Sequence, residues 1–149
     1  YGVGDSVTEQ AASIPADASD IFVFAGINDY NYGDSGIDMP DHTVAYDTDT
    51  FEGALCATIK QLVEGHPEAR VYLMSPAQAT TSWPAVFGIT LDDLADFYRA
   101  VAQVFGIRYI PSTQCGISPF NESITLDDGL HPSVFGQEMI ARTVLRAIT

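Results

Sequence analysis

Short apolar runs and longer amphipathic segments alternate along this chain. Three runs have the length of buried parallel strands: Ile21–Ala25, Val71–Met74 and Ile107–Ile110. Apolar residues recur at helical spacing in four other segments: Val7–Ile14, Thr50–Glu64, Thr90–Phe105 and Ser133–Ile148. Strands that alternate with helices predict an α/β domain whose parallel strands are joined by right-handed crossovers. In such a sheet, ligands bind beyond the carboxyl ends of the strands.

The ends of the predicted helices carry capping signals. Thr90 precedes a helical pattern and Asp93 follows three residues later, which is typical of a helix N-terminus. Gly106 ends that segment. We expect the inner face of the last helix to contain Met139, Ile140, Val144 and Leu145. The one long segment without a regular pattern, Asn28–Thr48, follows a strand end, where functional loops belong.

Composition narrows the class of protein. The chain has the length of a single domain, residues 1–149, and its hydrophobic content of 46% allows a sizeable core. The formal net charge of −14 argues against nucleic-acid or anionic-membrane binding and favours a neutral or cationic small substrate. No apolar run predicts a membrane-spanning helix, so we expect a soluble protein, either secreted or cytoplasmic. Cys56 and Cys115 are too few for a disulfide scaffold, and Cys56 is expected to be a buried free thiol.

The first candidate for chemistry follows the first predicted strand, at Gly26-Ile27-Asn28-Asp29. A glycine there lets the backbone turn sharply at the end of the strand. The amide of Asn28 would be an uncharged donor at the carboxyl edge of the sheet, suited to a developing oxyanion. Taken alone, this segment is more typical of an ordinary turn.

The second candidate is Asp128-Gly129-Leu130-His131-Pro132, directly before the last helix. Histidine can act as a general base near neutral pH when a partner holds its ring and selects its tautomer. Asp128, three residues earlier, can reach Nδ1 and leave Nε2 available. Asp127 is the competing carboxylate, and a capped helix start is the alternative interpretation of the motif.

Together, in this order, the two motifs resemble the third and fifth conserved blocks of the SGNH (GDSL-type) ester hydrolases. The resemblance spans the chain. It implies a three-layer α/β/α sandwich with a parallel, flavodoxin-like sheet of order 2-1-3-4-5. It also implies acyl transfer: a serine attacks an ester carbonyl, His131 takes the proton, Asp128 orients the imidazole and Asn28 contributes to the oxyanion hole. It implies no cofactor and no metal.

The family's nucleophile block has an apparent match at Gly4-Asp5-Ser6, but its position is wrong. In the family, a helix, a strand, a glycine-bearing loop and another helix separate that serine from the asparagine block. Only 19 residues separate Ser6 from Gly26, which is room for one helix. No glycine occurs from Val7 to Ala25, although the family's second block supplies one to the oxyanion hole.

The family's second block gives a better match to the start of the chain, Tyr1-Gly2-Val3-Gly4. This register makes Gly4 an oxyanion-hole residue and Ser6 a helix N-cap. The first strand and the nucleophilic Gly-Asp-Ser would then lie upstream of Tyr1, in a longer precursor or in a companion segment. Without that strand, an apolar sheet edge would be exposed and would need completion: Ile21, Val23 and Phe24.

Two alternatives stay open, a non-catalytic binding module with this fold and a shortened esterase that uses Ser6. The ester itself could be a short acyl ester, an acetylated carbohydrate or a lipid. Several acidic and amide residues could suggest calcium but lack EF-hand spacing, so we expect solvated loop side chains: Asp29, Asn31, Asp34, Asp38 and Asp41. Three loop aromatics could line a substrate pocket or pack locally: Tyr30, Tyr32 and Trp83.

Overall fold

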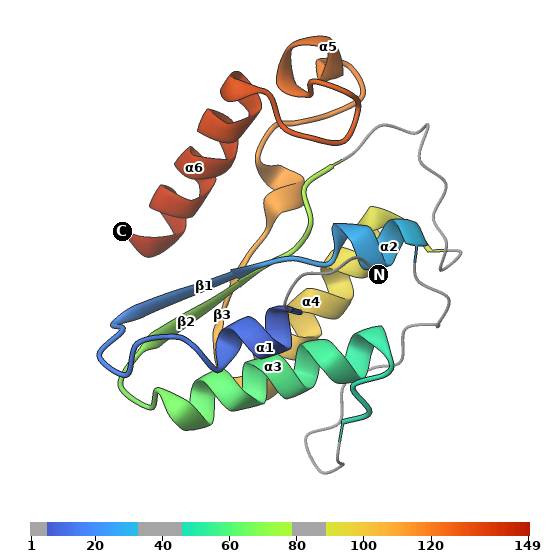
Figure 1. The fold of residues 1–149 in the computed structure, drawn as a ribbon. Helices are drawn as coiled ribbons and strands as arrows, with labels where there is room; N and C mark the ends of the chain where they lie inside the picture. The colour runs from blue at the N-terminus through green and yellow to red at the C-terminus, as the bar shows by residue number, and fades with distance from the viewer. Residues whose placement is uncertain (1–5, 33–45, 79–88) are drawn as a thin grey trace.

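Three parallel strands form the sheet of the computed structural model, which describes residues 6–32, 46–78 and 89–149 (Figure 1). Their order is β1-β2-β3, with both pairs parallel. The strands are β1 (Asp20–Phe24), β2 (Arg70–Met74) and β3 (Arg108–Ile110). The three predicted strands are confirmed, each displaced by no more than a residue at either end. A parallel sheet in chain order agrees with the expected α/β architecture.

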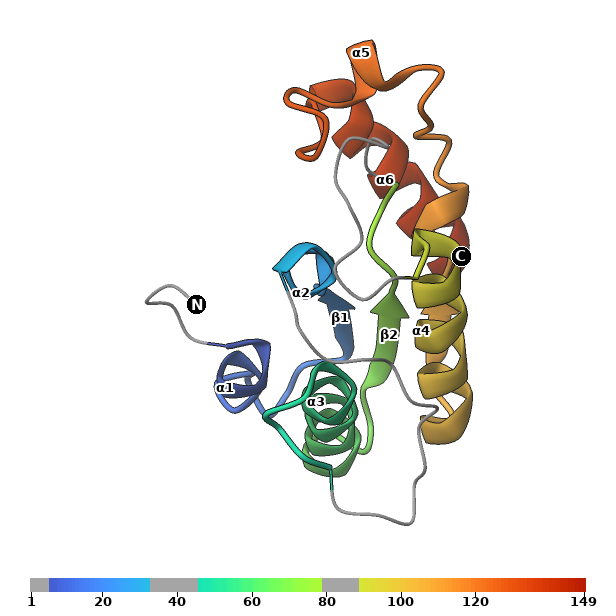
Figure 2. The same ribbon diagram turned by 90° about the vertical axis from the view of Figure 1, so that its right-hand side faces the viewer.

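Helices cover both faces of this sheet. The helical segments are α1 (Val7–Ala11), α2 (Ile27–Tyr32), α3 (Phe51–Gly65), α4 (Leu91–Phe105), the 3₁₀ turn η1 (Ser112–Gln114), α5 (Glu122–Thr125) and α6 (Val134–Ile148). The larger core joins β1 and β2 to α1, α3 and α4, and a smaller core joins β2 and β3 to α6. Figure 2 shows α1 beside α3, on one side of the sheet, with α6 on the other. The predicted α/β/α layering is therefore confirmed.

Side chains cap the helices, in α4 at the position that the sequence predicts. In α4, the Asp93 amide donates to the Thr90 hydroxyl oxygen at 3.1 Å, and the Thr90 amide donates to the Asp93 carboxylate at 2.9 Å. Gly106 ends α4 with φ +66°, a left-handed conformation that glycine adopts without strain. Ser133 caps α6 by accepting from the Gly136 amide at 3.2 Å. These are local effects that neighbouring residues produce by themselves.

Both cysteines are buried and free, as expected for Cys56. Cys56 lies within α3, and burial, reinforced by the charge of Glu52, raises the pKa of its thiol to about 11. Such a thiol is unreactive near neutral pH. None of the helices in the described part of the chain is long and apolar enough to cross a membrane.

Two predictions about regular structure were wrong. The segment from Asn28 onward begins in a short helix, α2, rather than in an irregular loop. Six residues cannot form a stable helix alone, so tertiary contacts must hold α2. Leu145 is 57% exposed, while Ile140 and Val144 pack against the sheet as expected. The helix is therefore rotated slightly from the orientation that its apolar pattern predicts.

The exposed apolar edge predicted on β1 is confirmed for Phe24 but wrong for Ile21 and Val23, and Phe22 is exposed in their place. Phe22 and Phe24 are 45% and 48% exposed, whereas Ile21 and Val23 are each 5% exposed. Successive side chains of a strand point to opposite faces, and α1 and α3 cover only the face of Ile21 and Val23. Among the described residues, β1 pairs with β2 alone, and a groove of about 420 Å³ lies between its other edge and α1.

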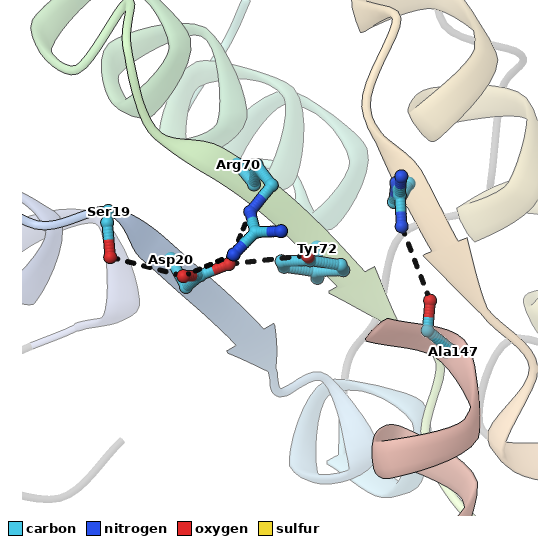
Figure 3. A network of polar contacts seen from close by, with 6 residues as sticks. Ser19, Asp20, Arg70, Tyr72 and Ala147 are labelled. Carbon is cyan, nitrogen blue, oxygen red and sulfur yellow. Dashed lines mark hydrogen bonds and ion pairs between the residues drawn. The ribbon is translucent and has the colours of Figure 1, made fainter. Parts of the chain in front are cut away.

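A polar network ties β1 to β2 at the amino ends of the strands (Figure 3). The Arg70 guanidinium donates to the Asp20 carboxylate at 2.8 and 2.9 Å, and the Tyr72 hydroxyl donates to it at 3.3 Å. Chiefly because of Arg70, the pKa of Asp20 lies below its usual value. On the same face, the Phe22 ring stacks on Tyr72 with centroids 4.6 Å apart. This end of the sheet is opposite to the end where the candidate motifs lie.

Candidate active site

The two predicted motifs meet at the carboxyl end of the sheet. A cavity of about 200 Å³ lies there, and both Asn28 and His131 line it. Its other lining residues come from the end of β1, the segment after β2 and the loop before α6: Phe24, Ala25, Ile27, Pro76, Ala77, Leu130 and Pro132. Apart from Asn28 and His131 the lining is apolar, so these two side chains supply its polar groups.

His131 is held by Asp128 through a short charge-assisted contact. Asp128 Oδ2 lies 2.7 Å from His131 Nδ1, while Asp128 Oδ1 accepts from the amides of Leu130 and His131 at 3.1 and 2.8 Å. An ionised carboxylate only accepts, so Nδ1 carries the proton, and in the neutral imidazole Nε2 is the nitrogen with the free lone pair. These hydrogen bonds, the His131 amide first, lower the pKa of Asp128 to about 2. The carboxylate is therefore ionised throughout the neutral range.

The backbone around this pair forms a closed loop. Leu126 and Pro132 form an antiparallel bridge, and the Asp127 amide donates to the His131 carbonyl at 2.9 Å. Gly129 turns the chain with φ +84°. Asp128 and not Asp127 is thus the carboxylate that contacts the imidazole. Both partners are solvent-exposed, with 73% of the His131 side chain and 55% of the Asp128 side chain accessible.

Asn28 lies in the first turn of α2, immediately beyond β1. Gly26 connects the two elements with φ +100°, and its carbonyl accepts from the Tyr30 amide at 2.9 Å. The preceding carbonyl, of Ala25, accepts from the buried Tyr98 hydroxyl at 2.8 Å. Asn28 itself is exposed toward the cavity that it shares with His131.

Ser6 lies in a neighbouring cavity of about 310 Å³, and Asn28 lines that cavity too. The Ser6 hydroxyl accepts from the Glu9 amide at 3.2 Å, and the Glu9 carboxylate accepts from the Ser6 amide at 2.7 Å. Ser6 is thus the N-cap of α1 in a complete capping box, as the preferred register predicts. Gly4 lies outside the described residues.

A buried hydroxyl cluster, which the sequence motifs did not reveal, supports the cavity wall after β2. The Tyr109 hydroxyl lies 3.0 Å from Ser75 Oγ, and Ser75 Oγ lies 2.9 Å from Ser112 Oγ. Ser112 also donates to the Pro76 carbonyl at 2.8 Å. Ser75 and Ser112 are fully buried. Their positions directly beyond β2 and β3 are the only signal in the sequence that could have indicated them.

Comparison with known proteins identifies the family. Residues 3–139 match the profile of the GDSL-like Lipase/Acylhydrolase family. The chain belongs to this family. GDSL-like hydrolases cleave esters, so at the level of the family this chain is an ester-cleaving hydrolase. No significant match was found among curated proteins.

Solved structures of other proteins share the GDSL fold. A protein from Lactobacillus plantarum has 24% identity and a TM-score of 0.82, with 95% of this chain and 72% of that one covered. A possible lipase from Chitinophaga pinensis has 16% identity and a TM-score of 0.71, covering 95% and 77%. A peptidoglycan O-acetylesterase has 16% identity and a TM-score of 0.65, covering 95% and 39%. At these identities the likeness concerns the fold.

Of the remaining candidates of this GDSL-like chain, those that the structure describes, Tyr30 and Asp29, do not line the cavity. Tyr30 is a core residue, 6% exposed, and its hydroxyl donates to the Ile89 carbonyl at 3.2 Å. It therefore packs locally and does not line a substrate pocket. Trp83 and the Tyr32 side chain lie outside the described residues, as do Asp34, Asp38 and Asp41. Asp29 is exposed, and no group of three or more metal-binding side chains occurs in the described part of the chain.

Proposed function

We propose that this chain is the base- and oxyanion-bearing part of a serine ester hydrolase. The observation that carries the proposal is the cavity shared by Asn28 and His131, with His131 held at Nδ1 by Asp128. An imidazole fixed in this way has one lone pair, on Nε2, with which to accept a proton. The nearby amide of Asn28 is a neutral donor that can stabilise developing negative charge.

The reaction proceeds by acyl transfer in two stages. The serine oxygen attacks the ester carbonyl carbon as its proton passes to His131 Nε2, and the carbonyl oxygen becomes an oxyanion. Asn28, together with the amides of Gly4 and of the serine, donates to that oxyanion. The intermediate expels the alcohol, which takes the proton from His131. Water then attacks the acyl-enzyme, with the same proton transfers, and releases the acid and the free serine.

The nucleophilic serine, we propose, comes from a segment upstream of Tyr1 or from a companion chain. The Ser6 hydroxyl supports this assignment because it is engaged in capping α1. So does β1, whose second edge is unpaired among the described residues and borders an apolar groove. A strand placed on that edge would end near Gly26 and Asn28, where its last residue could reach His131. Completion of the edge would also cover Phe22 and Phe24.

The substrate is an ester of neutral or cationic character. A net charge of −14 disfavours anionic substrates, and the cavity of about 200 Å³ suits a small acyl group. The similarity in fold to a peptidoglycan O-acetylesterase makes an acetylated carbohydrate one candidate beside short acyl esters and lipids.

A serine-directed probe tests this function. The full-length protein, carrying the residues upstream of Tyr1, is treated with a fluorophosphonate and mapped by peptide mass spectrometry, and p-nitrophenyl acetate hydrolysis is measured in parallel. We expect one adduct, on a serine outside residues 1–149, and its loss in the variant His131→Ala. An adduct on Ser6 would support the shortened esterase. If no adduct forms and no turnover is measured, the binding module is supported. Either this result or an adduct on Ser6 overturns the proposal.

A further inference from the structure

The side chain of Tyr98 ends against the backbone that carries Asn28. Tyr98 projects from α4, is 1% exposed, and donates its hydroxyl hydrogen to the Ala25 carbonyl at 2.8 Å. This contact joins residues 73 positions apart in the sequence. Ala25 is the last residue before the turn at Gly26, so the phenol acts at the point where the chain leaves the sheet.

Gly26 and Tyr98 are complementary in shape. A Cβ at position 26 would collide with the Tyr98 hydroxyl, and the φ of +100° would strain any other residue there. The phenol therefore occupies the space that the absent side chain leaves. Because burial, and next the charge of Asp29, raises the pKa of Tyr98, the hydroxyl stays protonated and can act only through its hydrogen bond and its volume.

The position of α2 follows from this turn. The Gly26 carbonyl accepts from the Tyr30 amide at 2.9 Å, a hydrogen bond that spans Asn28 and starts the helix. The side chain of Tyr30 gives α2 a second anchor, because its buried hydroxyl donates to the Ile89 carbonyl, next to the N-cap of α4. Two tyrosines thus hold a six-residue helix that could not form alone.

We propose that Tyr98 is a positioning residue that sets the amide of Asn28 for the oxyanion. This inference rests on the proposed function, in which Asn28 stabilises that charge. An oxyanion donor is effective only when it lies about 2.7–3.1 Å from the oxygen in the transition state. Loss of the Tyr98 hydroxyl lets the Ala25–Gly26 peptide rotate, and the displacement reaches Asn28 through the first turn of α2.

The test is a double-mutant cycle in the active full-length enzyme with p-nitrophenyl acetate: wild type, Tyr98→Phe, Asn28→Ala and both together. Phenylalanine keeps the ring contacts with Phe51 and Phe97. We expect Tyr98→Phe to lower kcat by about 10- to 100-fold with KM within about twofold. In the Asn28→Ala background, the same change should lower kcat no further, because the group that it positions is gone.

Tyr72→Phe is the matched control. It also removes a hydrogen-bonded hydroxyl from a fully buried tyrosine, but at the opposite end of the sheet. We expect kcat to be unchanged in this variant. Amide hydrogen exchange gives a readout without catalysis: the Tyr30 amide should exchange faster in Tyr98→Phe and not in Tyr72→Phe.

Each contrary result has its own meaning. If Asn28→Ala leaves kcat unchanged, the proposed function fails, and the role of Tyr98 fails with it. If Asn28→Ala is slow while Tyr98→Phe matches the wild type, the role of Tyr98 is refuted and the function stands. The role is also refuted if Tyr98→Phe lowers kcat by the same factor in both backgrounds, since it then acts on the fold in general.

Discussion

The two polar halves of the candidate site are held in opposite ways. His131 is fixed by its own neighbours: Asp128 is three residues away, and both side chains are more than half exposed. The turn and the helix that carry Asn28 are held by distant residues, through the Tyr98 hydroxyl on Ala25 and the Tyr30 hydroxyl on Ile89, across separations of 73 and 59 positions. One half is a local loop on the surface, and the other is an extension of the core.

This difference indicates which substitutions elsewhere in the fold each half of the site tolerates. The Asp128 loop depends on a turn, a bridge and one carboxylate, so changes elsewhere in the core should leave its geometry intact. In the proposed role of Tyr98, the placement of Asn28 depends on the hydrogen bond from α4 to the Ala25 carbonyl, so a core substitution far from the cavity can displace it. Precise placement of an oxyanion donor requires such rigid support, whereas a proton-accepting imidazole needs chiefly the correct tautomer.

The largest expected effect is that of His131→Ala. General acid–base catalysis is lost, and kcat of the active enzyme should fall by about 1,000- to 10,000-fold. Thermal unfolding should be nearly unchanged because the ring is mostly exposed. Turnover on p-nitrophenyl acetate and a thermal melt measure both quantities. Activity within tenfold of wild type would remove His131 from the mechanism.

Asn28→Ala should lower kcat by about 100- to 1,000-fold, the scale for one lost oxyanion donor. KM should change little, because the hydrogen bond strengthens only as charge develops. Steady-state kinetics on the same ester separates the two constants. A higher KM with unchanged kcat would instead make Asn28 a binding residue.

Gly26→Ala tests the dependence of the Asn28 half on the core. Added strain at positive φ and the collision with Tyr98 should lower the free energy of unfolding by about 3 kcal/mol. Gly106→Ala is the control, since Gly106 also has positive φ but no atoms within 4 Å of a built Cβ. It should cost about 1 kcal/mol. Urea titrations measure both values, and equal costs would show that Tyr98 does not fill the space at Gly26.

The Asp128 carboxylate, which holds His131, should titrate without affecting the rest of the fold. The pKa of Asp128 falls to about 2 in the folded chain, from a usual value of 3.8. Its stabilising contribution is therefore fully present above about pH 4 and is lost as the pH falls through about 2. The amide resonances of Leu130 and His131, which donate to this carboxylate, should move with that midpoint. In Asp128→Asn the transition should disappear, and a midpoint near 4 would contradict the paired geometry.

The smallest effect is expected for Ser6→Ala. Ser6 lines the cavity of about 310 Å³ that Asn28 also lines. Loss of the α1 cap should lower the free energy of unfolding by about 1 kcal/mol and leave turnover nearly intact. Ser13→Ala, an exposed serine beyond the end of the same helix, is the control and should cost less. Denaturant unfolding and p-nitrophenyl acetate kinetics measure the two effects. A catalytically inactive Ser6→Ala enzyme would identify Ser6 as the nucleophile.

The sequence by itself determined everything that depends on near neighbours. Alternating apolar runs predicted the three strands and their parallel arrangement, and Thr90 with Asp93 marked the start of α4. The Asp128–His131 contact was predictable because three residues on a turn bring the two side chains into reach. Asn28 was marked by the glycine that ends β1. These features follow from short-range geometry, which a linear pattern contains.

The tertiary structure alone decided which residues support the site and which face solvent. Helix α2 exists because Tyr30 and Tyr98 pack and bond across the core, although its own residues favour a loop. Along β1, the sequence predicted Ile21, Val23 and Phe24 at the exposed edge, but only the docking of α1 and α3 showed that Phe22 and Phe24 would be the exposed pair. The rotation of α6 left Leu145 outside for the same reason. Contacts between distant segments select among local conformations of similar energy. Such contacts depend on residues far apart in the sequence, so no single segment of the chain reveals them.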